Sequence, residues 1–289
     1  MKFNFKEALA FFQKGSLNEA KNLCIEALKE EPNNFDFLHL HGVISFGEKD
    51  YEKSEQLISK AIRLKPNFEI YDFYAFVLFN LGKFDLAIKS LDEVIRLKPD
   101  YAEAHNNRAN MLFKLGKVED SLKSYNAALK LNPYNSQAYN NLGILLGRLD
   151  KKNSALESYE KAIKIKPDYV EAHNNLGTIL KAMGKLENTL TSFLKASKLD
   201  SNYAAPHFNM ANIFHETGDI ETAIDAYRTA INIQPNYPGA YCNLGVAFQD
   251  QQKLKEAIEC YKIAIKQKPD YDDAFGNLGA ALQQMGKLE

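Results

Sequence analysis

Seven prolines divide this chain at a nearly constant interval, and that period restricts the possible folds more than any other feature. The interval is 34 residues, one shorter before Pro99, and Ser201 stands where a further proline would complete the series. A fixed period of roughly 20–50 residues is typical of arrays in which one supersecondary unit stacks on the next. The pattern therefore predicts eight units and the start of a ninth. The prolines are Pro32, Pro66, Pro99, Pro133, Pro167, Pro235 and Pro269.

Each unit is predicted to be two helices joined by a tight turn, with its proline at position 32. Position 8 is always Ala or Gly, position 20 is Ala, Ser or Thr, and position 27 is Ala except at Val94. Small residues at fixed points let two helix axes approach to the lower end of roughly 8–10 Å. Glycine follows the first helix in six units, and Pro–Asp pairs such as Pro99–Asp100 end the second. Apolar residues recur between these points at helical spacing, so the expected fold is all-α.

These positions resemble the tetratricopeptide repeat, which has the same period, and they recur in register along the whole chain. The resemblance implies a right-handed α-solenoid of helix-turn-helix repeats, because a single hairpin cannot bury its apolar face alone. We expect one superhelical domain over 1–289. Since the final residues GKLE also occur inside a repeat, at 184–187, we expect the chain to be a fragment of a longer protein. The predicted repeats are 1–34, 35–68, 69–101, 102–135, 136–169, 170–203, 204–237, 238–271 and a half repeat 272–289.

Asparagine recurs at position 6 of the first helix in six consecutive units, although it is a poor helix former. In tetratricopeptide proteins the first helices line a concave groove, so the resemblance places these side chains there. A carboxamide offers donors and an acceptor together, and can hold a peptide group through its N–H and its C=O. With helices roughly 10 Å apart, an extended peptide rising about 3.3 Å per residue meets one amide about every third residue. The predicted peptide-binding residues are Asn107, Asn110, Asn141, Asn175, Asn209, Asn212, Asn243 and Asn277.

Two other interpretations of these amides stay open. They can be solvated side chains copied with the repeat template, and Asn106, Asn140 and Asn174 at position 5 are likewise expected to lie away from the core. The file of amides also resembles the tetratricopeptide arm of O-linked N-acetylglucosamine transferases and their bacterial relatives, where groove asparagines hold the backbone of protein substrates. That resemblance implies that this chain is the N-terminal substrate-recruiting arm of a larger glycosyltransferase. The first three units depart from it, since they carry other residues at position 6, and these residues include no transferase domain.

Phenylalanine occupies position 12 in the first four units and adds to positions 6 and 9 of the third. A contiguous exposed apolar patch of several hundred Å² usually marks an interface. The stripe therefore predicts a surface for a hydrophobic partner segment or for a second copy of this chain, as in a homodimer. Alternatively, tighter local curvature buries these rings among themselves. The residues of this predicted interface are Phe12, Phe46, Phe73, Phe76, Phe79 and Phe113.

Charge, cysteine and motif content argue against several functions. Lys plus Arg (36) nearly balance Asp plus Glu (37), so no nucleic-acid partner is expected. The three cysteines form no CxxC pair and no catalytic motif occurs, so we expect neither metal nor cofactor and no enzyme within these residues. His105, His173 and His207 share position 4 in separate units and are predicted to pack. Because the cysteines suggest no disulfide framework, a reducing, cytoplasmic setting is expected. No apolar run approaches about 20 residues, so no membrane partner is expected. Together these features predict a non-catalytic scaffold that binds an extended polypeptide.

Overall fold

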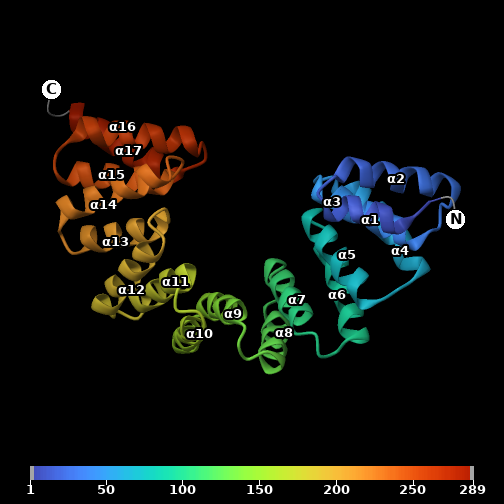
Figure 1. Ribbon diagram of the computed structural model, residues 1–289. Coiled ribbons are helices and arrows are strands. Elements are labelled where there is room, and N and C mark those ends of the chain that lie inside the picture. Colours follow the sequence, from blue (N-terminus) through green and yellow to red (C-terminus); the bar gives the residue numbers. More distant parts are fainter. Residues whose placement is uncertain (1–2, 287–289) are drawn as a thin grey trace. The chain divides into compact units, whose positions relative to one another are not determined.

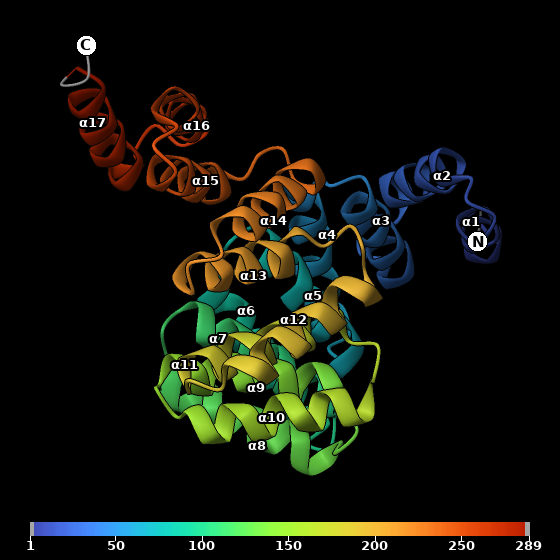
Figure 2. The same ribbon diagram turned by 90° about the vertical axis from the view of Figure 1, so that its left-hand side faces the viewer.

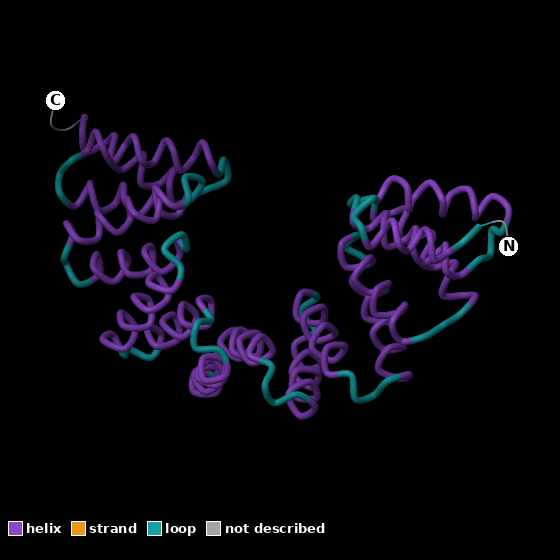
Figure 3. Tube along the Cα trace, in the orientation of Figure 1, coloured by secondary structure: helices purple, strands orange, loops and turns teal. Residues whose placement is uncertain are grey.

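The computed structural model describes residues 3–286, which form seventeen helices and, within that range, no strand (Figure 3). The all-α solenoid architecture is thereby confirmed. Odd-numbered helices are the first helices of the repeats and even-numbered helices are the second. The helices are α1 (Phe5–Gln13), α2 (Leu17–Glu30), α3 (Phe35–Gly47), α4 (Tyr51–Leu64), α5 (Phe68–Asn80), α6 (Phe84–Leu97), α7 (Ala102–Lys114), α8 (Val118–Leu131), α9 (Ser136–Arg148), α10 (Lys152–Ile165), α11 (Val170–Ala182), α12 (Leu186–Leu199), α13 (Ala204–Glu216), α14 (Ile220–Ile233), α15 (Pro238–Asp250), α16 (Leu254–Gln267) and α17 (Asp272–Gly286).

The chain forms two compact units, one up to Leu145 and one from Leu146 on. In the first unit α3 packs on α4, α5 on α6 and α7 on α8. The hairpins are joined by contacts of α2 with α3, α4 with α5 and α6 with α7. In the second unit the hairpins α11–α12, α13–α14 and α15–α16 stack in the same way, and α17 packs on both α15 and α16 (Figure 1, Figure 2). Neighbouring hairpins thus complete each other's core, while the single domain over 1–289 stays a prediction.

Glycine ends the first helix where the sequence predicts it. Gly82 has a φ of 70°, and the following Lys83 donates its N–H to the Leu78 carbonyl over 2.9 Å, as in a Schellman cap. Left-handed glycines recur at 15, 116, 184 and 218, whereas Gly286 is the last residue of α17. The sequence does not reveal that non-glycine residues adopt the same conformation in three other units. These residues are Lys49, Asp150 and Gln252.

The small residues of the repeat mark a close approach of the two helices. A Cβ added to Gly177 would lie 2.6 Å from the ring of buried Phe193, so this glycine leaves room for the aromatic side chain at position 24. At position 20, the Ser121 hydroxyl donates to the Ala109 carbonyl over 2.8 Å and ties the two helices together. The hairpins are therefore closely packed, and the positions left over on the first helices are the ones that can serve a ligand.

Candidate functional site

All eight predicted peptide-binding asparagines lie half-buried on first helices. Several of them also join consecutive repeats. In the first compact unit the Asn141 Nδ2 donates to the Asn110 Oδ1 over 3.0 Å, and the Tyr125 hydroxyl donates to the same oxygen over 2.6 Å. We call this arrangement an amide–tyrosine triad. Because burial raises the pKa of the Tyr125 phenol, this hydroxyl stays protonated and remains a donor.

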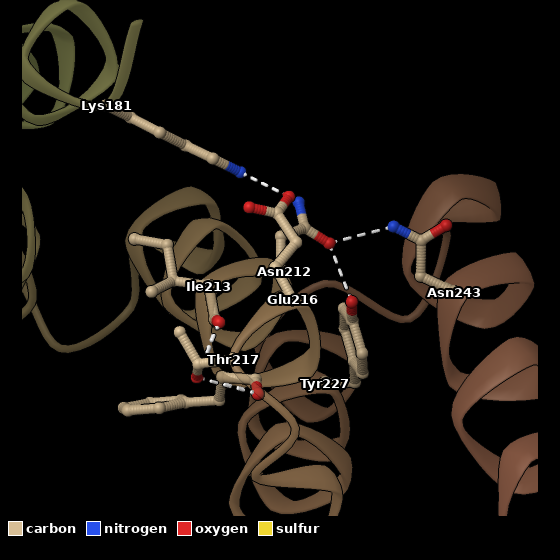
Figure 4. A network of polar contacts seen from close by, with 8 residues as sticks. Lys181, Asn212, Ile213, Glu216, Thr217, Tyr227 and Asn243 are labelled. Atoms are coloured by element: carbon tan, nitrogen blue, oxygen red, sulfur yellow. Dashed lines mark hydrogen bonds and ion pairs between the residues drawn. The ribbon is translucent and has the colours of Figure 1, made fainter. Parts of the chain in front are cut away.

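A second amide–tyrosine triad occupies equivalent positions in the other compact unit. The Asn212 Oδ1 accepts from the Asn243 Nδ2 over 2.8 Å and from the Tyr227 hydroxyl over 2.7 Å. Figure 4 shows the Asn243 carboxamide with its nitrogen turned to Asn212 and its oxygen turned away. The bridge therefore fixes the orientation of the amide without using its acceptor.

Two further bridges use position 5 as the acceptor. The Asn209 Nδ2 donates to the Asn174 Oδ1 over 3.0 Å, and the Asn277 Nδ2 lies 3.6 Å from the sulfur of buried Cys242. The expectation that position 5 lies away from the core is wrong, since Asn106, Asn140 and Asn174 are all buried. The Asn174 oxygen receives the amide of the next repeat, whereas the Asn106 oxygen is buried without a hydrogen-bond partner among the described residues. These three residues are therefore not displayed to a ligand.

Asn107 and Asn175 are the remaining asparagines at position 6, and both are half-buried. Asn107 makes no hydrogen bond with any residue in the described range 3–286, so its carboxamide keeps its donors and its acceptor. It lies on the wall of a cavity of about 390 Å³ in the first compact unit. Asn107 is thus the member of the file best placed to meet a ligand.

This cavity, which we call the Phe76 cavity, contains residues from both predicted sets. Three of the predicted asparagines and three of the predicted phenylalanines meet there, on α5, α7 and α9. The sequence suggests two separate surfaces that share only the repeat 102–135, whereas in the structure members of both sets line one pocket with mainly apolar walls. Its lining consists of Phe76, Phe79, Asn107, Asn110, Met111, Phe113, Lys114, Tyr125, Gln137, Asn141 and Ile144.

The remaining phenylalanines of the stripe are partly buried by packing. The Phe46 ring lies 5.3 Å from that of Tyr51 and 5.4 Å from that of Phe73, measured between centroids. Phe12 is half-buried against the core of the first repeats. By contrast, 49% of the Phe76 surface is exposed, and this ring stands at the cavity. Among the six phenylalanines of the stripe, Phe76 is therefore the one that is exposed.

A smaller cavity of about 270 Å³ lies beside the triad of the second compact unit, and its lining is more polar. His215 and Glu216 occupy positions 12 and 13 there, where the Phe76 cavity has Phe113 and Lys114. The Lys181 Nζ binds Glu216 over 2.7 Å, and the His215 Nε2 lies 2.8 Å from Asp250 (Figure 4 shows the first pair). The two cavities therefore share their amides and differ in apolar surface and charge.

Two of the position-4 histidines bond to the backbone, and the three cysteines are buried. His105 and His173 each place Nε2 within hydrogen-bonding distance of the proline carbonyl that ends the preceding helix, at 3.1 and 2.9 Å. All three cysteines are buried, and burial raises the pKa of Cys260 to about 11, which keeps this thiol protonated. Across residues 3–286 no group of three or more His, Cys, Asp or Glu side chains could hold a metal ion. No helix in that range has the length and apolarity needed to cross a bilayer.

Family models describe almost the whole chain as tetratricopeptide repeats. Models of the tetratricopeptide repeat match residues 5–67, 77–136 and 124–157, and a TPR repeat model matches 151–184, 177–218, 211–252 and 247–286. The chain therefore belongs to the tetratricopeptide repeat family. The resemblance inferred from the small residues and the prolines is confirmed at this level, and a comparison with curated proteins finds no match.

Three solved structures illustrate the shared fold. The crystal structure of MamA is 24% identical over 55% of this chain and 94% of its own, with a TM-score of 0.53. YrrB, described as a TPR protein with an unusual peptide-binding site, is 22% identical over 64% of this chain and 96% of its own, with a TM-score of 0.50. A tetratricopeptide repeat protein from Parabacteroides merdae is 17% identical over 86% of this chain and 98% of its own, with a TM-score of 0.70.

Proposed function

We propose that this protein is a non-catalytic interaction scaffold whose first helices bind an extended segment of another polypeptide. The observation that carries the proposal is the set of half-buried position-6 amides held in fixed orientations by bridges to the preceding repeat. An amide whose orientation is already set loses little conformational freedom when a ligand binds, which favours affinity. Each bridge uses one N–H of the donor amide and leaves the second for a peptide group. The oxygens of Asn209 and Asn243 accept from no described residue, whereas the Asn141 oxygen lies 3.5 Å from the Asn140 Nδ2.

Two further observations support a polypeptide as the partner. YrrB, whose fold is similar, is described as having a peptide-binding site. The formal net charge of this chain is −1, with 36 basic and 37 acidic residues, whereas a nucleic-acid partner calls for a clustered basic surface. The alternative of a substrate-recruiting arm of a glycosyltransferase stays a prediction, as do the cytoplasmic location and self-association through the phenylalanines. Reading the gene beyond Glu289 tests the transferase alternative directly.

The proposal can be tested with random 12-residue peptides displayed on phage and selected on the whole chain. Selected peptides are resynthesised with a fluorescent label, and their affinities are measured by anisotropy. If amides hold the peptide backbone, N-methylation of single peptide bonds in a selected sequence weakens binding. The methyl group removes a backbone N–H donor and leaves every side chain of the peptide unchanged. A decrease of about 2- to 13-fold per lost hydrogen bond is expected.

Variants of the chain identify the binding face. We expect Asn107→Ala or Asn175→Ala to weaken the selected peptides, whereas Asn126→Ala, the same change at an exposed site on the second helix α8, leaves their affinity unchanged. Unchanged affinity in all three variants would refute the proposed role of the amides. Selection of no peptide above background would refute the scaffold proposal itself.

A further inference from the structure

The Phe76 cavity has the size and surface of a pocket for a large apolar group. Its volume of about 390 Å³ falls within the roughly 300–1,000 Å³ typical of ligand sites. Phe76, Phe79, Phe113, Met111 and Ile144 are the apolar residues of its wall. Burial of an aromatic or long aliphatic side chain against such a wall is strongly favourable, while a short or polar side chain leaves it unfilled.

Polar groups on the same wall can bind the ligand's backbone on either side of its bulky apolar side chain. The Asn107 carboxamide has no hydrogen-bond partner in residues 3–286. The Asn110 oxygen already accepts two hydrogen bonds, while no described residue accepts from its Nδ2. Asn107 can therefore both donate to and accept from a peptide group, and Asn110 can donate. A small apolar molecule would leave these groups without partners, whereas a peptide would satisfy them.

The charge at the rim of the cavity adds a second preference. Lys114 is exposed, and its Nζ lies 4.5 Å from the centroid of the Phe79 ring and 5.6 Å from that of Phe84. It forms no ion pair with a described residue, while neighbouring Lys117 binds Asp85 over 2.8 Å. The contact with the ring holds the ammonium beside the cavity and leaves its outer side open to an anion.

From these observations we infer that the Phe76 cavity selects the bound segment: it takes one bulky apolar side chain and places an Asp or Glu, one or two residues away in the ligand, beside Lys114. The inference rests on the proposed function and names its ligand class. The corresponding cavity of the second compact unit has His215 and Glu216 at the equivalent positions, and Glu216 already binds Lys181. The preference is therefore a property of the Phe76 cavity and not of the repeat in general.

A positional-scanning peptide library on the whole chain provides the test. We expect enrichment of Phe, Tyr, Trp, Leu, Ile or Met at one position, with Asp or Glu within two residues of it. In a resynthesised peptide, replacing the apolar residue by Ala weakens binding about fivefold or more, as at a typical interface anchor. Replacing the acidic residue by its amide weakens binding about 1.4- to 5-fold, as for an exposed ion pair.

Matched variants of the chain assign these preferences to the cavity. Lys114→Glu reverses the preference from acidic to basic neighbours, whereas Lys130→Glu, the same change at an exposed site on α8, does not. Phe76→Ala weakens binding of the apolar residue, and because this ring is half exposed the variant is expected to fold; far-ultraviolet circular dichroism checks this.

Three results would overturn the inference. In the first, the selected peptides lose affinity in Asn107→Ala or Asn175→Ala but contain no apolar and acidic pair, and Phe76→Ala and Lys114→Glu bind them as tightly as the wild type does. This result refutes the role of the Phe76 cavity and leaves the scaffold proposal intact. Selection of no peptide refutes both proposals. If the wild type sediments as a dimer that Phe76→Asp dissociates, and no peptide competes with it, the occupant is a second copy of the chain.

Discussion

The amide–tyrosine triad of the second compact unit provides a quantitative test of the bridges between repeats. In Asn212→Ala, the Tyr227 hydroxyl and the Asn243 amide both lose their acceptor. Only 1% of Tyr227 is exposed, so its hydroxyl is left buried without a partner, at a free-energy cost of about 1–3 kcal/mol. The lost amide bond adds about 0.5–1 kcal/mol, and the better helix propensity of Ala returns a few tenths, roughly. The free energy of unfolding is therefore expected to fall by about 1–4 kcal/mol.

A double-mutant cycle separates the orphaned hydroxyl from the rest of this loss. Tyr227→Phe alone is expected to lower the free energy of unfolding by about 1 kcal/mol. In the double variant no buried hydroxyl remains, so its loss is smaller than the sum of the two single losses by about 1–2 kcal/mol. Guanidinium denaturation followed by circular dichroism measures all four chains, provided that the denaturant dependence stays constant.

The equivalent triad serves as an internal replicate, since Asn110→Ala and Tyr125→Phe remove the same bonds in the other compact unit. Losses that add to within about 0.5 kcal/mol in both triads would refute the reasoning. The result also bears on binding experiments, because substitutions of bridging amides such as Asn141 and Asn209 change stability together with affinity. Asn107, which has no hydrogen-bond partner in the described residues, avoids this difficulty.

Three further predictions concern stability. Gly177→Ala forces a Cβ to 2.6 Å from the Phe193 ring and should lower the free energy of unfolding by about 1–3 kcal/mol. Gly279→Ala is at the same repeat position with nothing within 4 Å, and should raise the free energy of unfolding by about 0.5–1 kcal/mol. Equal effects of the two changes in denaturation would contradict the packing argument. Lys49→Gly relieves a φ of 66° and should stabilise the chain by about 0.5–1 kcal/mol in the same assay; a loss of stability would show that no strain exists there. Burial lowers the pKa of His41 below 6.5, so the unfolded chain binds a proton at this side chain more readily than the folded chain does. The free energy of unfolding therefore falls as the pH drops through about 6.5. His41→Leu should lose less stability than the wild type between about pH 7.5 and about pH 5, and an unchanged pH slope would contradict this.

The repeat pattern predicts the fold well because each of its marked positions records a local requirement. Ala or Gly at position 8 reflects contact with position 24 in the same hairpin, and glycine after the first helix reflects a left-handed residue. The left-handed conformations of Lys49, Asp150 and Gln252 escape prediction, since these residue types do not mark a positive φ as glycine does.

The site is predicted less completely, because its contacts join neighbouring repeats. The asparagines are recognised from repetition, but their bonds connect residues 31 or 35 positions apart, as in Asn110–Asn141 and Asn174–Asn209. Asparagine at position 9, tyrosine at position 24 and asparagine at position 6 of the next repeat form a pattern that could have revealed the triads. The meeting of phenylalanines and asparagines at the Phe76 cavity depends on how α5, α7 and α9 stack, which periodicity does not specify.

The bridges also affect how such an array can change length during evolution. Asn243 donates to a residue at position 9 of its neighbour, whereas Asn209 donates to a residue at position 5. If the repeat 204–237 were deleted, Asn243 would follow the repeat that contains Asn174, whose oxygen now accepts from Asn209. A donor that is compatible with acceptors at either place lets the gene lose or duplicate a whole repeat without stranding a polar group at the new junction.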